Sequence, residues 1–147
     1  MTVKKRKPSV RKLTAPQTRT LLATSSFVQM LDGRLARVHK DGVTLACPVH
    51  AGVHNVFGSL HGGVPASMAD TAAGIALQRH FGGNQPMTTV EFKINYFLPV
   101  IEGTLFARAR IVRVGSSICV ASVDLTDSAR RMVGMALVTY MLLGNRR

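Results

Sequence analysis

The chain has 147 residues, of which 46% are hydrophobic and 18% are charged. This length and balance fit one globular domain with its own core. No apolar run reaches the length of a transmembrane helix, and the basic N-terminus lacks the apolar stretch of a secretory signal. We therefore expect a cytoplasmic protein that is not inserted in a membrane.

The net charge is +12, and half of this excess comes from six lysines and arginines within residues 1–15, which contain no acid. We expect residues 1–15 to form a disordered basic tail and residues 16–147 to form the folded domain. A surplus of positive charge favours anionic partners, such as nucleic acid, acidic lipid or a phosphorylated cofactor.

The first part of the folded domain is expected to contain a helix and a hairpin. The helix covers residues 17–31 and ends at the turn pair Asp32-Gly33. Apolar residues alternate over 35–39 and 43–49, on either side of Asp41-Gly42. An Asp-Gly pair between two alternating segments is typical of a two-residue β-hairpin.

The longest expected helix covers residues 64–80, because Pro65 suits the first turn and Gly82-Gly83 suits the end. Small and apolar residues cover nearly all of its surface, so we expect it to be buried. Four strand-like runs with short turns between them follow, typical of an antiparallel meander: about 87–98, 104–114, 117–126 and 132–143. These elements favour an α+β fold in which one antiparallel sheet wraps around one helix.

Several common kinds of functional site are not expected. Cys47 and Cys119 lie in apolar strand patterns far apart in the chain, so we expect buried free thiols rather than a disulfide. No Cys/His group has the spacing of zinc ligands, so we expect no metal. The glycine pairs lack the lysine of a phosphate-binding loop, and no Gly-x-Ser-x-Gly motif indicates a serine hydrolase.

The most informative segment is residues 61–70, which read HGGVPASMAD. It places a glycine pair at the start of the long helix and one carboxylate, Asp70, on an otherwise apolar surface. Asp70 is the sole acid between Asp41 and Glu91. A carboxylate in such a helix is costly unless it has a partner or a function. We expect that function to be activation of a nucleophile against a polarised carbonyl.

Over residues 30–143 the chain resembles the hotdog-fold acyl-CoA thioesterases of the phenylacetate-degradation (PaaI-like) branch. The resemblance rests on Asn55, on the His-Gly-Gly of 61–63, on Asp70 after six further residues, and on the stretch 92–99 (FKINYFLP). It implies homodimers, often paired into tetramers, with active sites at the dimer interface. It also implies that acyl-CoA is the substrate and that no cofactor is needed, since coenzyme A enters as part of the substrate.

Thioester hydrolysis needs a donor for the oxygen that becomes negative and a base or nucleophile for the carbonyl carbon. Backbone N–H groups at a helix start are free donors in a positive field. We expect the Gly62 N–H to be the main carbonyl contact, with Gly63 beside it and Asp70 as base or nucleophile. Eight helical residues separate Gly62 from Asp70 by roughly 12 Å along the axis. One carbonyl can therefore meet both groups only if they come from two subunits.

The resemblance also assigns supporting residues. Asn55 and His61 would orient the thioester or the attacking water. A hydroxyl on the following strand would hold the water beside Asp70; Thr89 suits this role best and Thr88 is the alternative.

The phosphates of coenzyme A require basic side chains. Five arginines are candidates, although each also suits a solvated strand face or turn: Arg108, Arg110, Arg113, Arg130 and Arg131. Four apolar side chains are candidates for lining an acyl or aryl pocket: Phe57, Met68, Ile75 and Phe81.

Two other functions are weighed against thioester hydrolysis. A hotdog dehydratase or hydratase acting on acyl thioesters would also pair a histidine with an acid, but at other positions. A non-catalytic acyl-CoA sensor, or a nucleic-acid-binding module that uses residues 1–15, would belong to a different class. We rank the nucleic-acid partner last, because no helix-turn-helix or aromatic stacking platform is evident.

Overall fold

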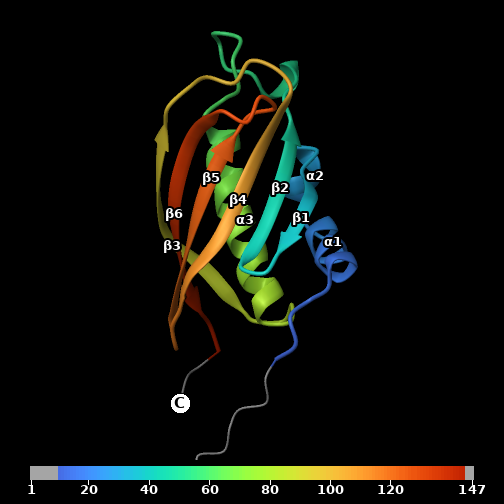
Figure 1. Ribbon diagram of the computed structural model, residues 1–147, viewed down its shortest axis with the longest axis vertical. Coiled ribbons are helices and arrows are strands. Elements are labelled where there is room, and N and C mark those ends of the chain that lie inside the picture. Colours follow the sequence, from blue (N-terminus) through green and yellow to red (C-terminus); the bar gives the residue numbers. More distant parts are fainter. Residues whose placement is uncertain (1–9, 145–147) are drawn as a thin grey trace, which may run out of the picture.

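The computed structural model describes residues 10–144, in which an antiparallel sheet curls around a central helix (Figure 1). The sheet has six strands in the order β1-β2-β4-β5-β6-β3, which confirms the predicted α+β architecture. The helical elements are α1 (Ala15–Ala23), α2 (Ser26–Met30), η1 (Ala51–Val53) and α3 (Gly63–His80). The strands are β1 (Arg34–His39), β2 (Gly42–Pro48), β3 (Met87–Tyr96), β4 (Thr104–Val114), β5 (Ile118–Thr126) and β6 (Met132–Leu142).

The single helix predicted over residues 17–31 is wrong, because two short helices occupy this region. Ser25 begins the second one: its hydroxyl accepts a hydrogen bond from the Val28 N–H at 3.3 Å. A capping box at Thr14 begins the first one. A serine that caps a new helix in this way interrupts the preceding one. Figure 1 shows the pair on the outside of the hairpin formed by β1 and β2.

The predicted basic tail lies partly outside the described residues, which begin at position 10. The backbone N–H of Leu13 donates to the Arg79 carbonyl at 3.0 Å, and α1 already begins at Ala15. The described chain therefore joins the fold before residue 16, where the sequence suggested that the domain starts.

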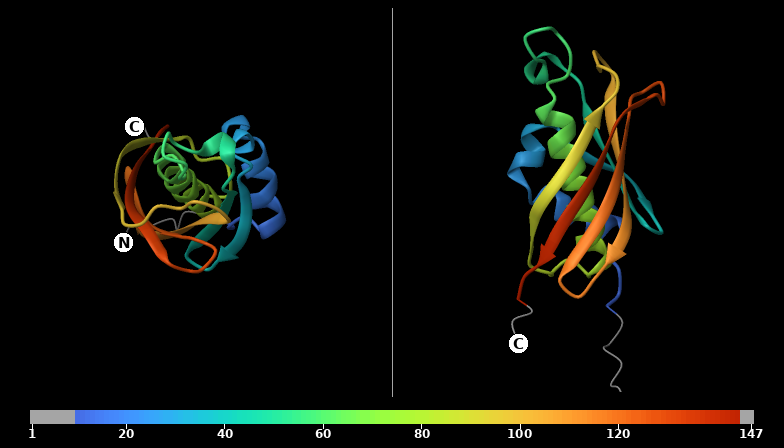
Figure 2. Two further views of the ribbon diagram at one scale, coloured as in Figure 1. Left: turned by 90° about the horizontal axis from the view of Figure 1, so that it is seen from above. Right: turned by 90° about the vertical axis from the view of Figure 1, so that its left-hand side faces the viewer.

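Helix α3 runs through the inside of the curled sheet, and Figure 2 shows it enclosed when the molecule is seen from above. Four alanines and one glycine are among its nine buried residues, so the helix backbone approaches the strands closely. The larger side chains Met68 and Leu77 are fully buried on the same helix. The burial predicted from its composition is thus confirmed.

Strand β3 does not follow the predicted meander. It pairs with β6 rather than with β4, so of the four strands in the predicted meander β4, β5 and β6 are joined as sequential neighbours and β3 is not. The connection from β3 to β4 crosses one end of the molecule, at the top of Figure 1, so β3 becomes an edge strand. This pairing places Thr89 directly opposite Tyr140, and the hydroxyl groups of both residues contact Asp70.

Both cysteines are buried and free, as predicted. Burial raises the pKa of the Cys47 thiol to about 11, so this group is a poor nucleophile near neutral pH. Among the helices of residues 10–144, none is long and apolar enough to cross a lipid bilayer.

Candidate active site

The diglycine turn presents one unengaged backbone donor at the start of α3. The His61 carbonyl accepts from the Val64 N–H at 2.9 Å, and the His61 Nδ1 accepts from the Gly63 N–H at 2.9 Å. Within the described residues, the Gly62 N–H has no hydrogen-bond partner. The Gly62 N–H is thus the donor that remains available to a ligand.

This geometry changes the predicted roles of the neighbouring residues. The Gly63 N–H is occupied by the His61 ring, so it is not a second free donor. The His61 contact requires an unprotonated Nδ1 and therefore places the ring proton on Nε2. His61 is exposed and is not among the residues that line the adjacent pocket, so its visible role is to shape the turn.

A pocket of about 350 Å³ opens beside Gly62. Segments that are distant in sequence form it: the loop before α3, the start of α3, the end of β3 with the crossing segment that follows, and one residue each from β5 and β6. Its lining is mainly apolar and comprises Asn55, Leu60, Gly62, Pro65, Tyr96, Phe97, Leu98, Pro99, Val100, Leu125 and Val133. An apolar pocket with one free N–H at its wall suits an acyl group whose carbonyl needs a donor.

Asn55 lines this pocket, but its side chain serves its own loop. Its Oδ1 accepts from the backbone N–H groups of Phe57 at 2.9 Å and Ser59 at 3.2 Å. Its Nδ2 donates to the Ser59 hydroxyl at 3.0 Å. The amide therefore holds the loop closed, rather than pointing a free group at a substrate as the resemblance implied.

Asp70 lies eight residues after Gly62, on the side of α3 that faces β3 and β6. The Thr89 hydroxyl donates to Asp70 Oδ1 at 2.9 Å, and the Tyr140 hydroxyl lies 2.9 Å from the same oxygen. Tyr140 is also 2.9 Å from the Asp70 carbonyl oxygen. In the described part of the chain, Oδ2 contacts no donor. The carboxylate is thus held through one oxygen, and the other is available for chemistry.

Tyr140 was not identified from the sequence. Its ring is almost completely buried, and burial raises the pKa of its phenol far above the usual range, so the hydroxyl remains a proton donor. Gly74, one turn after Asp70, makes room for it: a Cβ there would lie 2.7 Å from the Tyr140 hydroxyl oxygen. A tyrosine among apolar strand residues is the signal that was available, because a buried hydroxyl needs a partner.

Of the two threonines proposed to assist Asp70, Thr89 is the one that reaches it. Thr88 is exposed and pairs with Met141, so it lies on the opposite face of β3. Asp70 does not line the pocket beside Gly62. Within one chain the structure therefore keeps the donor and the acid at separate places.

Residues 57–133 match the family model described as the thioesterase superfamily. The chain belongs to the thioesterase superfamily. The 1,4-dihydroxy-2-naphthoyl-CoA hydrolase of Listeria monocytogenes is 25% identical over 113 residues, which cover 77% of this chain and 92% of that protein. Hydrolysis of thioesters is thus supported at the level of the family.

Solved structures of this superfamily have the same fold. A thioesterase from Haemophilus influenzae matches with a TM-score of 0.83 at 22% identity, over 95% of this chain and 99% of that one. The PaaI protein from the phenylacetic acid degradation operon of Escherichia coli matches with a TM-score of 0.77 at 20% identity, over 85% and 89%. These matches confirm the hotdog fold and the resemblance to PaaI that the sequence suggested.

Two of the arginines predicted to bind coenzyme A are engaged in ion pairs in this thioesterase-superfamily chain. Arg108 contacts Asp41, and Arg110 contacts Asp124. Both arginines alternate with buried alanines of β4, so they lie on the sheet face away from α3. Their placement favours a structural role over a role beside Gly62 or Asp70.

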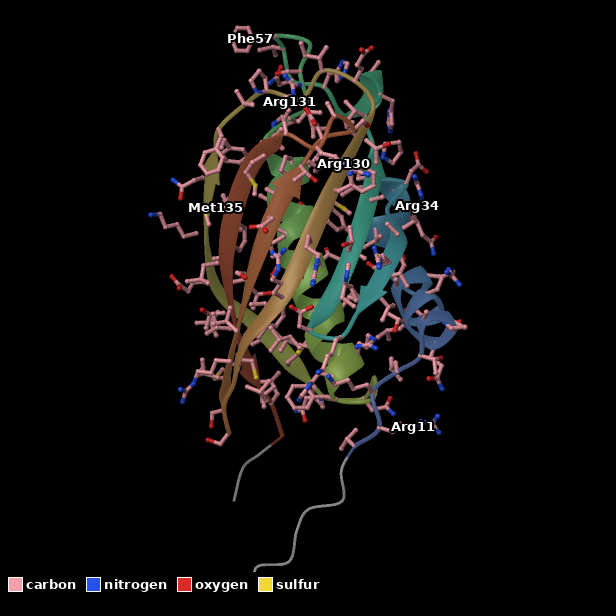
Figure 3. All side chains as sticks on the ribbon, viewed as in Figure 1. Arg11, Arg34, Phe57, Arg130, Arg131 and Met135 are labelled. Carbon is pink, nitrogen blue, oxygen red and sulfur yellow. The ribbon has the colours of Figure 1, made fainter. Side chains whose placement is uncertain are left out.

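The other three arginines lie on the surface. Arg131 pairs with Asp127 at 2.7 Å, and Arg130 adopts a positive φ of 62° in the same turn (Figure 3). Arg113 is exposed near the end of β4. Arg131 lines a second hollow of about 400 Å³, which shares Leu98, Pro99 and Val100 with the pocket beside Gly62. Of the five arginines, Arg131 is thus the one that adjoins this pocket.

The four apolar side chains predicted for the acyl pocket do not line it. Met68 is buried in the core, and Ile75 packs against that core. Phe81 contacts the His80 ring edge to face. Phe57 is 91% exposed and projects from the loop at the top of Figure 3. The crossing segment after β3 supplies the lining instead, which local sequence patterns did not indicate.

Proposed function

We propose that this protein is an acyl-CoA thioesterase in which Asp70 of one subunit and the Gly62 N–H of another act on the same thioester. The observation that carries the proposal is the Asp70 carboxylate, fixed through Oδ1 by Thr89 and Tyr140 and open at Oδ2. An ion held in this way by neutral donors keeps an oriented oxygen for a reacting partner.

As a general base, Asp70 takes a proton from water while the oxygen of that water attacks the thioester carbon. The carbonyl oxygen becomes negative and accepts the Gly62 N–H, in the positive field of the α3 N-terminus. Collapse of this intermediate breaks the carbon–sulfur bond, and the coenzyme A thiolate leaves and takes up a proton. As a nucleophile, Asp70 would first form a mixed anhydride that water then cleaves.

The proposal requires a homodimer, because roughly 12 Å of helix axis separates Gly62 from Asp70 in one chain. Strand β3 supports this, since it is an edge strand whose outer backbone groups can pair with a second copy. We further propose that two dimers associate. A stripe on the outer face of β6 would be covered by such pairing: Met135, Leu137 and Met141, which are 47%, 50% and 40% exposed.

Coenzyme A as the leaving group is supported by the name of the Listeria relative and by the position of Arg131. A guanidinium beside the acyl pocket suits phosphate recognition. Two free cysteines are compatible with the reducing cytoplasm, which contains acyl-CoA. The reaction needs no dissociable cofactor, because the thioester itself supplies the driving force.

The central experiment measures free thiol released from a panel of acyl-CoA esters, from acetyl through long-chain to hydroxyphenylacetyl. We expect hydrolysis by the wild type and a loss of at least about 100-fold in kcat for Asp70→Asn. Asp32→Asn is the matched control, because Asp32 is exposed and far from the site in sequence, and it should hydrolyse normally. Normal turnover by a folded, dimeric Asp70→Asn variant would falsify the assignment.

Two additions make this experiment more specific. An enoyl-CoA substrate separates hydrolysis from hydration, because a hydratase adds water without releasing thiol. A single turnover in ¹⁸O-labelled water separates the two roles of Asp70. Water that attacks the Asp70 carbon of the mixed anhydride leaves ¹⁸O in the Asp70 carboxylate, whereas the general-base route places it only in the acid product. Label in Asp70 therefore identifies the nucleophilic route.

A further inference from the structure

We infer that Tyr96 is a positioning residue, whose hydroxyl holds the Gly62 carbonyl and thereby aims the Gly62 N–H at the substrate. This inference rests on the proposed function and adds a residue to it. Tyr96 is the last residue of β3, and its hydroxyl donates a hydrogen bond to the Gly62 carbonyl oxygen. Its ring lines the same pocket as Gly62 and lies beside the glycine.

The polar groups around Gly62 show why this contact matters. Two planar peptide units meet at the Gly62 Cα, and together they carry four polar groups. Three of these groups are engaged: the His61 carbonyl by Val64 N–H, the Gly63 N–H by His61 Nδ1, and the Gly62 carbonyl by Tyr96. In the part of the chain that the structure describes, the fourth group, the Gly62 N–H, is the one left unpaired.

A glycine pair is the most flexible backbone available, so a donor placed on it needs external restraint. His61 restrains the second peptide unit at its N–H, and Tyr96 restrains the same unit at its carbonyl. Without the Tyr96 hydroxyl, the Gly62 carbonyl keeps only the first helical bond from the Ala66 N–H, which is long at 3.3 Å. A terminal bond of this kind frays easily.

The Tyr96 contact differs from ordinary packing, because it crosses from an edge strand to the start of the central helix. Residues 96 and 62 are joined by no other hydrogen bond in the described chain. Tyr96 is 52% exposed, and the burial of the rest of its side chain raises the pKa of the phenol, so the hydroxyl remains protonated and acts as a donor near neutral pH. A restrained donor stabilises a developing oxyanion without first being reorganised, which lowers the barrier to hydrolysis.

The substitution Tyr96→Phe tests this inference, because it removes the hydroxyl and keeps the ring that lines the pocket. We expect kcat for acyl-CoA hydrolysis to fall about tenfold while KM changes by less than about twofold, since the donor is used mainly in the transition state. Thr20→Val is the matched control: it removes an exposed hydroxyl that bonds to a backbone carbonyl on α1, and its kcat should remain that of the wild type. A purely structural role for Tyr96 would lower the melting temperature without this separation of kcat from KM.

A second measurement does not depend on turnover. In protein labelled with ¹³C at glycine carbonyls, the Gly62 carbonyl signal should move upfield in Tyr96→Phe, because a hydrogen bond to that oxygen is lost. The Gly63 amide proton, which is bonded to His61 Nδ1, should also exchange faster with solvent, because its peptide unit loses one of its restraints. The signal of Gly144, the last described residue, serves as the internal reference because it is distant in sequence from Gly62.

The outcomes separate this inference from the proposed function. An unchanged Gly62 signal, or a shifted signal with an unchanged kcat, overturns the role of Tyr96 even if the wild type is an active thioesterase. A wild type that releases no thiol overturns the proposed function. In that case the Gly62 carbonyl signal alone decides whether Tyr96 restrains the turn.

Discussion

The Tyr140 hydroxyl lies 2.9 Å from Asp70 Oδ1, although 70 positions separate the two residues in the sequence. The contact joins the central helix to β6, beside the Thr89 hydroxyl on β3. Three elements therefore meet at one carboxylate oxygen and leave its second oxygen open. This arrangement explains why an acid is tolerated on the alanine-rich surface of α3, because two hydroxyl groups stabilise the charge of the carboxylate through Oδ1.

Tyr140→Phe should lower activity and stability by similar free energies, since a tenfold change in rate corresponds to about 1.4 kcal/mol. It removes one of two donors to Asp70 Oδ1, so the carboxylate gains freedom and kcat should fall about tenfold. The ring remains in its buried site, so the free energy of unfolding should fall by only about 1–2 kcal/mol. Steady-state kinetics and urea unfolding measure the two effects. An active variant with wild-type kcat would show that Thr89 alone is sufficient to hold Asp70.

Gly74→Ala should disturb the Asp70 carboxylate indirectly, by displacing Tyr140. The new Cβ would lie 2.7 Å from the Tyr140 hydroxyl oxygen, and this overlap forces the ring away from Asp70. We expect a loss of about 1–3 kcal/mol from overpacking, although alanine favours a helix. Thr71→Ala, on the same helix, is the control and should leave the melting temperature nearly unchanged. A Gly74→Ala protein more stable than the wild type would contradict the close approach.

Gly62→Ala should separate folding from function. Gly62 has φ of −57° and a built Cβ would lie 3.5 Å from the Tyr96 ring, so nothing in the fold requires glycine here. The free energy of unfolding should change by about 1 kcal/mol or less. The methyl group would enter the space beside the free N–H, and kcat/KM should fall at least about tenfold. Full activity of a normally folded Gly62→Ala variant would place the carbonyl contact elsewhere.

Asp127 should contribute a pH-dependent part of the stability. Hydrogen bonds from the Arg131 backbone, the Arg131 side chain and the Ala129 backbone hold its pKa below the ordinary value of 3.8. A depressed folded-state pKa means that the stabilisation is present above 3.8 and is lost as the pH falls through the folded value. Asp127→Asn should therefore be less stable than the wild type at pH 7, and the difference should vanish in strong acid.

Thermal unfolding of both proteins between about pH 7 and pH 2 measures this difference. Parallel curves over the whole range would show that the charge of Asp127 has no part in the turn. The same turn holds Arg131 in the hollow that adjoins the pocket beside Gly62. Loss of the turn should consequently raise KM for acyl-CoA before it affects kcat.

Local patterns in the sequence determined much of this protein. The helix over the alanine-rich run 64–80 and the hairpin near Asp41 follow from short-range periodicity and turn chemistry, and both are observed. The hairpin turn itself is shifted by one residue from the predicted Asp41-Gly42: it consists of Lys40-Asp41, because Gly42 already pairs with His39. Asp70 could be identified because a lone acid on an apolar helix has a large desolvation cost, which composition alone reveals. The glycine pair before it marked the helix start for the same local reason.

Tertiary structure decided the contacts that give these groups their roles. Pairing of β3 with β6 rather than β4 depends on long-range packing around α3, and it brought Tyr140 to Asp70 and Tyr96 to Gly62. Sequence periodicity shows which face of a strand is buried, but not which strand lies beside it, because every antiparallel neighbour satisfies the same alternation. The occupied N–H of Gly63 likewise depends on a side-chain rotamer of His61, which only the folded turn selects.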